Sequence, residues 1–159
     1  MKYEFINKDL FIKNRKSLIS KLKKHSIVIF NSNDILPTNS DGTMPFIQNS
    51  DLFWLSGIDQ EESILVIHYN TNKKKFEELL FLKETNEHIA IWEGEKLTKK
   101  IAFNVSGISS IYWLSDFENI VDALISKSQN IYLNKNMHSR ANTPCLLYTS
   151  DAADECRCV

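Results

Sequence analysis

Five short apolar runs, separated by polar turns and amphipathic stretches, most restrict how this chain can fold. Each run is four to seven residues long and rich in β-branched or aromatic residues, as buried strands are. These runs lie at 26–31, 63–69, 77–82, 110–114 and 130–133. Apolar residues three and four apart predict helices at 9–23, 97–105 and 116–127. Strands that alternate with helices in the second half, around a central hairpin, predict an α/β fold with a mixed β-sheet flanked by helices.

Local signals indicate where several of these elements end. Asp9 is expected to cap the first helix, and Asn49 or Ser50 a short helix within the aromatic segment 46–58. Gly107 is expected to close the helix that begins at Leu97, because glycine is common at helix C-termini. Residues 32–45 contain two prolines and a glycine and predict a loop.

Composition excludes several classes of protein. The chain has 159 residues, 43% of them hydrophobic, which is one domain with enough apolar residues for a core. Lys and Arg total 19 against 20 Asp and Glu, so a dedicated nucleic-acid binder, with its basic excess, is not expected. No apolar run approaches the ~20 residues of a membrane span. The polar start MKYEFINKDLF lacks a signal-peptide core, so we expect a cytoplasmic protein.

The last segment differs from the rest of the chain. All three cysteines, Cys145, Cys156 and Cys158, lie there. The string CLLYTSDAADE, which begins at Cys145, resembles one reading frame of a transposase adapter used to prepare sequencing libraries. We therefore expect residues 1–144 to be a domain of a truncated parent protein and residues 145–159 to be a non-native tail.

Common catalytic motifs are missing from the sequence. GxGxxG, the P-loop, HExxH and GxSxG are all absent, and no metal-ligand pattern stands out. The four histidines are far apart, and His68, within a predicted strand, is expected to face solvent or a neighbouring helix in a structural role. Asp59, Glu61 and Glu62 form an acidic group that could serve acid–base or metal chemistry. Solvated turn residues are the favoured interpretation of these three.

The sequence predicts different degrees of burial for three aromatic residues. Phe53 and Trp54 lie in an apolar stretch and are expected in the core. Trp92 precedes the polar turn Glu93–Lys96, so it can be half-exposed, as contact residues at interfaces and cleft rims often are. Plain packing in the core is the alternative for Trp92.

Two segments in this order resemble a known signature. FIQNSDLFWLSGI at 46–58, followed by ESIL at 62–65, resembles the RQNSDFxYLTG…E(S/A)xL segment of the N-terminal domain of aminopeptidase P, the Xaa-Pro aminopeptidases. Residues 81–82 and 91–94 resemble the family's LF…EIWxG segment, and Asn14-Arg15 resembles its RR…L start. The resemblance covers roughly residues 8–134. The sequence departs from it at Ile47, where the family commonly has Arg, and at 88–90.

The resemblance implies a fold and an activity. It implies a creatinase-type α/β N-terminal domain, joined in the parent to a C-terminal domain of the "pita-bread" fold. There two Asp, one His and two Glu bind two metal ions, usually manganese, and a bridging water attacks the bond before a proline at position two. None of these ligands can be placed in this chain. The fragment is therefore expected to bind no cofactor and to catalyse nothing itself.

The same resemblance implies partners and one site residue. Peptides with proline second are the expected substrates of the parent, and the N-terminal domain is expected to help assemble a homo-oligomer. Trp92 matches a family position that can reach the substrate cleft of a neighbouring subunit, so it is the candidate cleft-rim residue; no catalytic or metal-binding residue is assigned. Two alternatives remain open: the N-terminal domain of a prolidase or creatinase-like hydrolase, and a free-standing α/β binding or assembly module.

Overall fold

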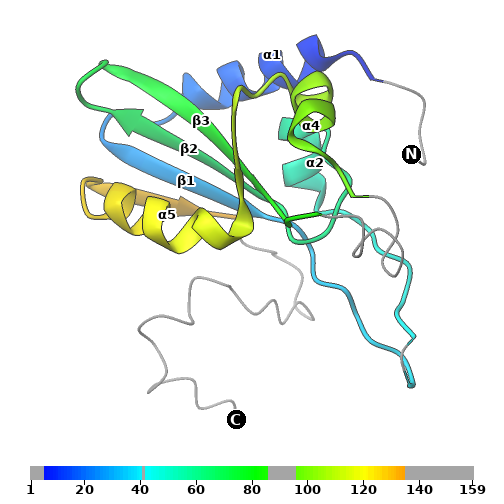
Figure 1. The fold of residues 1–159 in the computed structure, drawn as a ribbon. Coiled ribbons are helices and arrows are strands. Elements are labelled where there is room, and N and C mark those ends of the chain that lie inside the picture. Colours follow the sequence, from blue (N-terminus) through cyan, green and yellow to red (C-terminus); the bar gives the residue numbers. More distant parts are fainter. Residues whose placement is uncertain (1–5, 41, 86–95, 135–159) are drawn as a thin grey trace.

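A single mixed β-sheet organises the part of the chain that the structure describes (Figure 1). The computed structural model describes residues 6–40, 42–85 and 96–134. The strand order is β4-β3-β2-β1-β5. The strands are β1 (Ser26–Asn31), β2 (Ile64–Asn70), β3 (Lys75–Leu82), β4 (Ser110–Trp113) and β5 (Asn130–Leu133). The predicted fold class, a mixed sheet flanked by helices, is confirmed, and each expected strand is present within two residues of its predicted ends.

Both pairing directions occur in this sheet. The central strands β1, β2 and β3 are antiparallel neighbours, so β2 and β3 form the expected hairpin. The two outer strands are parallel to their neighbours: β5 pairs with β1 and β4 pairs with β3. Parallel pairs require crossover connections, and these connections carry the helices of the second half.

Helices cover both faces of the sheet (Figure 1). One face packs against α1 (Lys8–Ile19), α2 (Ser50–Ser56) and α4 (Lys99–Ser106), with Leu65, Ile67 and Leu80 in its core. The other face packs against α5 (Phe117–Ile125), which follows the 3-10 turn η1 (Leu114–Asp116). All five residues of α5 that the periodicity predicts to face inward belong to this second core or pack against it. They are Phe117, Ile120, Val121, Leu124 and Ile125.

Helices α2 and α4 end in the same way. Each finishes with a serine whose hydroxyl donates to the carbonyl four residues back, followed by a left-handed glycine and an isoleucine. The glycines are Gly57 and Gly107, with φ of 71° and 72°. Because glycine adopts positive φ without a Cβ clash, each can terminate its helix abruptly. The predicted stop at Gly107 is confirmed.

Two side chains of α1 hold the C-terminal end of α2. Asn14 Nδ2 donates to the Trp54 carbonyl at 2.8 Å, and Arg15 Nη1 donates to the Leu55 carbonyl at 2.8 Å. Carbonyls of the last turn have no partner inside a helix, so these bonds satisfy two of them. Arg15 is buried, with 1% of its surface exposed, and its Nε lies 2.9 Å from Glu78 Oε2 on β3. The Asn14-Arg15 pair therefore joins α1, α2 and the sheet.

Two expectations about α1 and α2 are wrong. The cap of α1 is Asn7, whose side chain accepts from the Asp9 N–H, because the helix begins one residue before Asp9. Trp54 is 53% exposed and does not lie in the core. Helix α2 has only seven residues, and Leu52 and Leu55 take the positions that face the sheet. The cap of α2 is Asn49, one of the two residues expected.

Among the described helices, none has the length and apolar character that crossing a membrane requires.

Candidate functional site

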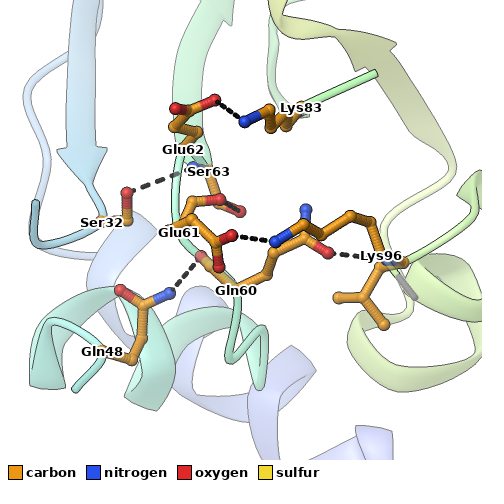
Figure 2. Close-up of polar contacts among 9 residues, drawn as sticks. Ser32, Gln48, Gln60, Glu61, Glu62, Ser63, Lys83 and Lys96 are labelled. Atoms are coloured by element: carbon orange, nitrogen blue, oxygen red, sulfur yellow. Dashed lines mark hydrogen bonds and ion pairs between the residues drawn. The ribbon is translucent and has the colours of Figure 1, made fainter. Parts of the chain in front are cut away.

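The loop between α2 and β2 gathers polar contacts from four separate parts of the chain (Figure 2). Residues 58–63 form this loop, and the contacting side chains and amides come from Ser32, Gln48, Lys83 and the Lys96–Leu97 pair. We call these residues together the anchor cluster.

Two consecutive carboxylates of the anchor cluster pair with two lysines, one before and one after residues 84–95 in the sequence. Glu62 Oε2 lies 3.3 Å from Lys83 Nζ, one residue past the end of β3. Glu61 forms an ion pair with Lys96, and both side chains are nearly buried, at 13% and 11% exposed. Glu62 has a φ of 51°, in the left-handed region, and Figure 2 shows the two carboxylates reaching toward different lysines. The loop therefore contacts both Lys83, which precedes residues 84–95, and Lys96, which follows them.

Gln60 adds a neutral contact to the same side of the cluster. Its side chain is buried, and Oε1 accepts from the Leu97 N–H at 2.6 Å. Gln48 Nε2 in turn donates to the carbonyls of Gln60, at 2.8 Å, and Ile58, at 3.1 Å. Buried polar groups need such partners, so these bonds fix the path of the loop. Gln60 Nε2 has no hydrogen-bond partner among the described residues.

The acidic group predicted from the sequence is thus only partly a set of solvated turn residues. Glu61 and Glu62 are engaged with lysines, and Glu61 is largely buried. The described part of the chain contains no group of three or more His, Cys, Asp or Glu side chains that could hold a metal ion. Sequence reasoning gave no role to Gln48 or Gln60, because nothing in their local pattern indicates which distant carbonyls and amides they meet.

The candidate cleft-rim residue, Trp92, lies outside the described residues, as do His88, His138 and the three cysteines. The cleft-rim role of Trp92 therefore stays a prediction. What the structure adds is the pair of attachments, Glu62 to Lys83 and Glu61 to Lys96, on either side of the segment that contains it.

We expect the two carboxylates to differ in their effect on stability. Replacing Glu61 by Gln should lower the free energy of unfolding by about 1–3 kcal/mol, because it removes the carboxylate from a nearly buried Lys96. Replacing Glu62 by Gln should cost less than about 1 kcal/mol, since that pair is partly exposed. Urea unfolding of both variants measures the difference, and equal losses would contradict this ranking.

His68 is buried in the sheet rather than facing solvent. Its side chain, 9% exposed, has Nε2 3.7 Å from Glu77 Oε2 on the neighbouring strand. Burial lowers the pKa of His68 below its ordinary value of 6.5, and the Glu77 carboxylate opposes that shift only in part. The imidazole is therefore neutral near pH 7, and its contact with Glu77 is not a salt bridge there. The prediction of a structural role is consistent with this placement.

This placement predicts a pH dependence of stability. Because the pKa of His68 is lower in the folded chain, the unfolded chain binds more protons as the pH falls through this range. We expect His68 to contribute fully to the free energy of unfolding above about pH 6.5. This contribution should be lost as the pH falls from there through the folded-state pKa of His68. Urea unfolding at closely spaced pH values between 7.5 and 5.5 measures this slope. His68→Gln should flatten it, and an unchanged slope in that variant would assign the effect to other groups.

Comparison with known proteins places this arrangement in a family. The family model described as aminopeptidase P, N-terminal domain, matches residues 11–132. A Xaa-Pro aminopeptidase of Haemophilus influenzae is 20% identical over 136 residues, which are 86% of this chain and 31% of that protein. The chain therefore spans about a third of the length of this relative.

Solved structures show the same fold. A Bacillus anthracis protein assigned as an aminopeptidase P has a TM-score of 0.79 at 21% identity, covering 89% of this chain and 34% of that one. Aminopeptidase P from E. coli with the inhibitor Pro-Leu has a TM-score of 0.76 at 19% identity, covering 86% of this chain and 31% of that one. The family match spans more than half of the sequence and extends from α1 into β5. The chain belongs to the aminopeptidase P N-terminal domain family.

Proposed function

We propose that this chain is the noncatalytic N-terminal domain of a cytoplasmic, manganese-dependent Xaa-Pro aminopeptidase. The longer protein would release the first residue from peptides with proline second. The observation that carries the proposal is the family match over residues 11–132, together with a much longer relative that is named for this activity. Residues 145–159 would be a non-native tail.

The metal ions of this activity are assigned to the separate C-terminal domain. The described residues of this domain offer no cluster of His, Cys, Asp or Glu ligands that fits a two-metal centre. When bound, the ions would supply an activated water for peptide hydrolysis. The contribution of this domain would be assembly of a homo-oligomer and control of which peptides reach the cleft.

The first experiment establishes the longer protein. The source DNA is sequenced past codon 144, and the complete product is assayed on a Xaa-Pro-Xaa tripeptide, a matched Xaa-Ala-Xaa tripeptide and a Xaa-Pro dipeptide. After chelation, manganese is added back and activity is measured again. We expect cleavage of the proline tripeptide only, restored by manganese. Cleavage confined to the dipeptide would indicate a prolidase, and a natural stop after Val159 would favour a free-standing module.

Trp92 carries the gating part of the proposal. Lys83 and Lys96, described residues on either side of the segment that contains it, both pair with carboxylates of the anchor cluster. We propose that Trp92 lines the rim of the substrate cleft of a neighbouring subunit. An aromatic side chain there would favour peptide N-termini over longer or folded substrates.

We expect Trp92→Ala in the full-length protein to lower kcat/KM for proline tripeptides by about tenfold, mainly through KM, because a substrate contact is lost. Trp54→Ala is the matched control, since Trp54 is a half-exposed tryptophan on α2. It should leave the kinetics unchanged. Unchanged kinetics in Trp92→Ala would remove this role while leaving the aminopeptidase assignment in place.

A further inference from the structure

Exposed lysines gather at one end of the sheet, where the β2–β3 hairpin turns and where β1 and β5 begin (Figure 1). Three connections meet there: α1 to β1 at 20–25, β2 to β3 at 71–75 and α5 to β5 at 126–129. None of the three contains Asp or Glu. We call six of their exposed lysines the basic end: Lys21, Lys23, Lys24, Lys74, Lys75 and Lys127.

Contacts between the three connections hold the basic end together. The Gln129 N–H donates to the His25 carbonyl at 2.7 Å, which joins the connections before β5 and β1. The His25 ring packs against Tyr69, with centroids 5.0 Å apart, and Tyr69 packs against Phe76 at 5.3 Å, which adds the β2–β3 hairpin. The lysines therefore project from one braced face of the molecule.

The positive charge of the basic end is not neutralised within the described part of the chain. The carboxylates of Glu77 and Glu78, at the start of β3, pair with Lys73 and Arg15. No described Asp or Glu forms an ion pair with any lysine of the basic end. Because Asp and Glu total 20 against 19 Lys and Arg in the whole sequence, the rest of the chain carries an acidic excess. The near-zero net charge thus conceals one strongly basic end.

One position of the turn shows lysine where another residue is usual. Lys74 has a φ of 52°, in the left-handed region that turns generally fill with Gly or Asn. The hairpin therefore has a positive charge at a position that backbone conformation alone would not assign to lysine.

The chemistry of the basic end favours a flat anionic surface as its partner. It contains lysine and no arginine, and the planar fork of arginine is what bidentate recognition of phosphates and bases uses. The large apolar side chains that are exposed in the described residues lie outside these connections, so the basic end lacks exposed aromatic platforms for stacking bases. The lysines are instead distributed over the ends of four neighbouring strands, a width of about 15 Å.

We propose that the basic end binds anionic lipid headgroups at a membrane surface. Clustered lysines are attracted to an anionic bilayer within about a Debye length, and no apolar insertion is needed. The binding is peripheral, reversible and sensitive to salt. The acidic remainder of the chain would orient the domain with this end toward the bilayer.

Co-sedimentation of the 159-residue chain with vesicles tests the inference. At about 0.05 M salt, we expect phosphatidylcholine vesicles with about 30% phosphatidylglycerol to bind at least about tenfold more tightly than phosphatidylcholine alone. About 0.5 M salt should abolish this difference by screening. Lys24→Gln, Lys74→Asn and Lys127→Gln together remove one charge from each connection and should weaken binding at least about tenfold. Asn is used at position 74 because it tolerates the left-handed conformation.

The control variant changes the net charge equally at other places. Lys8→Gln, Lys13→Gln and Lys100→Gln lie on α1 and α4 and should leave vesicle binding within about twofold of the wild type. Equal losses in the two triple variants would overturn the proposal, because net charge rather than the basic end would then govern binding. Equal affinity for the two kinds of vesicle would also overturn it.

Two further measurements complete the test. Fluorescence anisotropy with a single-stranded oligonucleotide is measured at the same salt, and tighter binding to it than to the anionic vesicles would identify nucleic acid as the partner and overturn the proposal. Urea unfolding checks the first triple variant. If it is less stable than the wild type, a second variant of the basic end, Lys21→Gln with Lys23→Gln and Lys75→Gln, decides in its place. No peptide substrate is used, so the outcome is separate from that of the proposed function.

Discussion

Arg15→Met is expected to lower the free energy of unfolding by about 3–5 kcal/mol, the range for breaking a buried ion pair by removing one partner. Arg15 is 1% exposed, and its guanidinium donates to the last turn of α2 while lying 2.9 Å from the Glu78 carboxylate. Methionine fills similar space but makes neither contact. The Leu55 carbonyl loses its donor and Glu78 loses its cation, so α1, α2 and the sheet are no longer joined by this side chain.

Guanidinium chloride unfolding of the wild type and three variants separates the causes of this loss. Lys16→Met, at the exposed neighbouring position, should change stability by less than about 0.5 kcal/mol. Arg15→Lys keeps the charge but not the forked geometry, so it should remain clearly destabilised. Arg15→Met combined with Glu78→Gln should lose less than the sum of the single losses, because the carboxylate that lacks a cation is gone. Additive losses would show that Arg15 and Glu78 do not interact.

The fold could be predicted because its signals are local. A run such as 130–133 has the length and branching of a strand in the sequence, and the structure places β5 at those residues. The spacing of apolar residues in 116–127 gave the inward face of α5 correctly. Trp54 was misplaced because an apolar segment does not reveal which side of a seven-residue helix meets the sheet. For His68, alternation along one strand left solvent and a neighbouring helix as alternatives; its burial excludes solvent.

The anchor cluster could not be predicted, because its contacts join residues that are far apart in the sequence. Gln60 and Leu97 are 37 positions apart, and Glu61 and Lys96 are 35 apart. The sequence did present the acidic group before β2, but its pairing depends on β3 returning Lys83 to the same end of the sheet. The polar turn after Trp92 indicated a contact residue, and resemblance to a family supplied the cleft-rim role, which stays a prediction.

Gly57→Ala is expected to destabilise the domain by about 3 kcal/mol, through both backbone strain and overpacking. The φ of 71° places Gly57 in the left-handed region, where a Cβ crowds the backbone. A Cβ built there would lie 2.4 Å from Phe11 Cε2 and 2.6 Å from Cζ. The Phe11 ring is 3% exposed and packs edge-to-face against Phe53, so it cannot move without disturbing the contact between α1 and α2.

Gly107→Ala provides a matched comparison, because Gly107 ends α4 with the same Ser-Gly-Ile sequence and a φ of 72°. Its Cβ would lie 2.8 Å from Ile12 Cδ1, the end of a flexible and partly exposed side chain that can rotate away. The backbone strain is then shared by both variants, and we expect a loss of only about 1–2 kcal/mol. Urea unfolding of the two variants isolates the effect of the Phe11 ring as the difference between their losses. If the two losses are equal, backbone conformation alone explains the requirement for glycine at both helix ends; if Gly57→Ala loses more, the close approach of α1 to the end of α2 is a second, independent requirement.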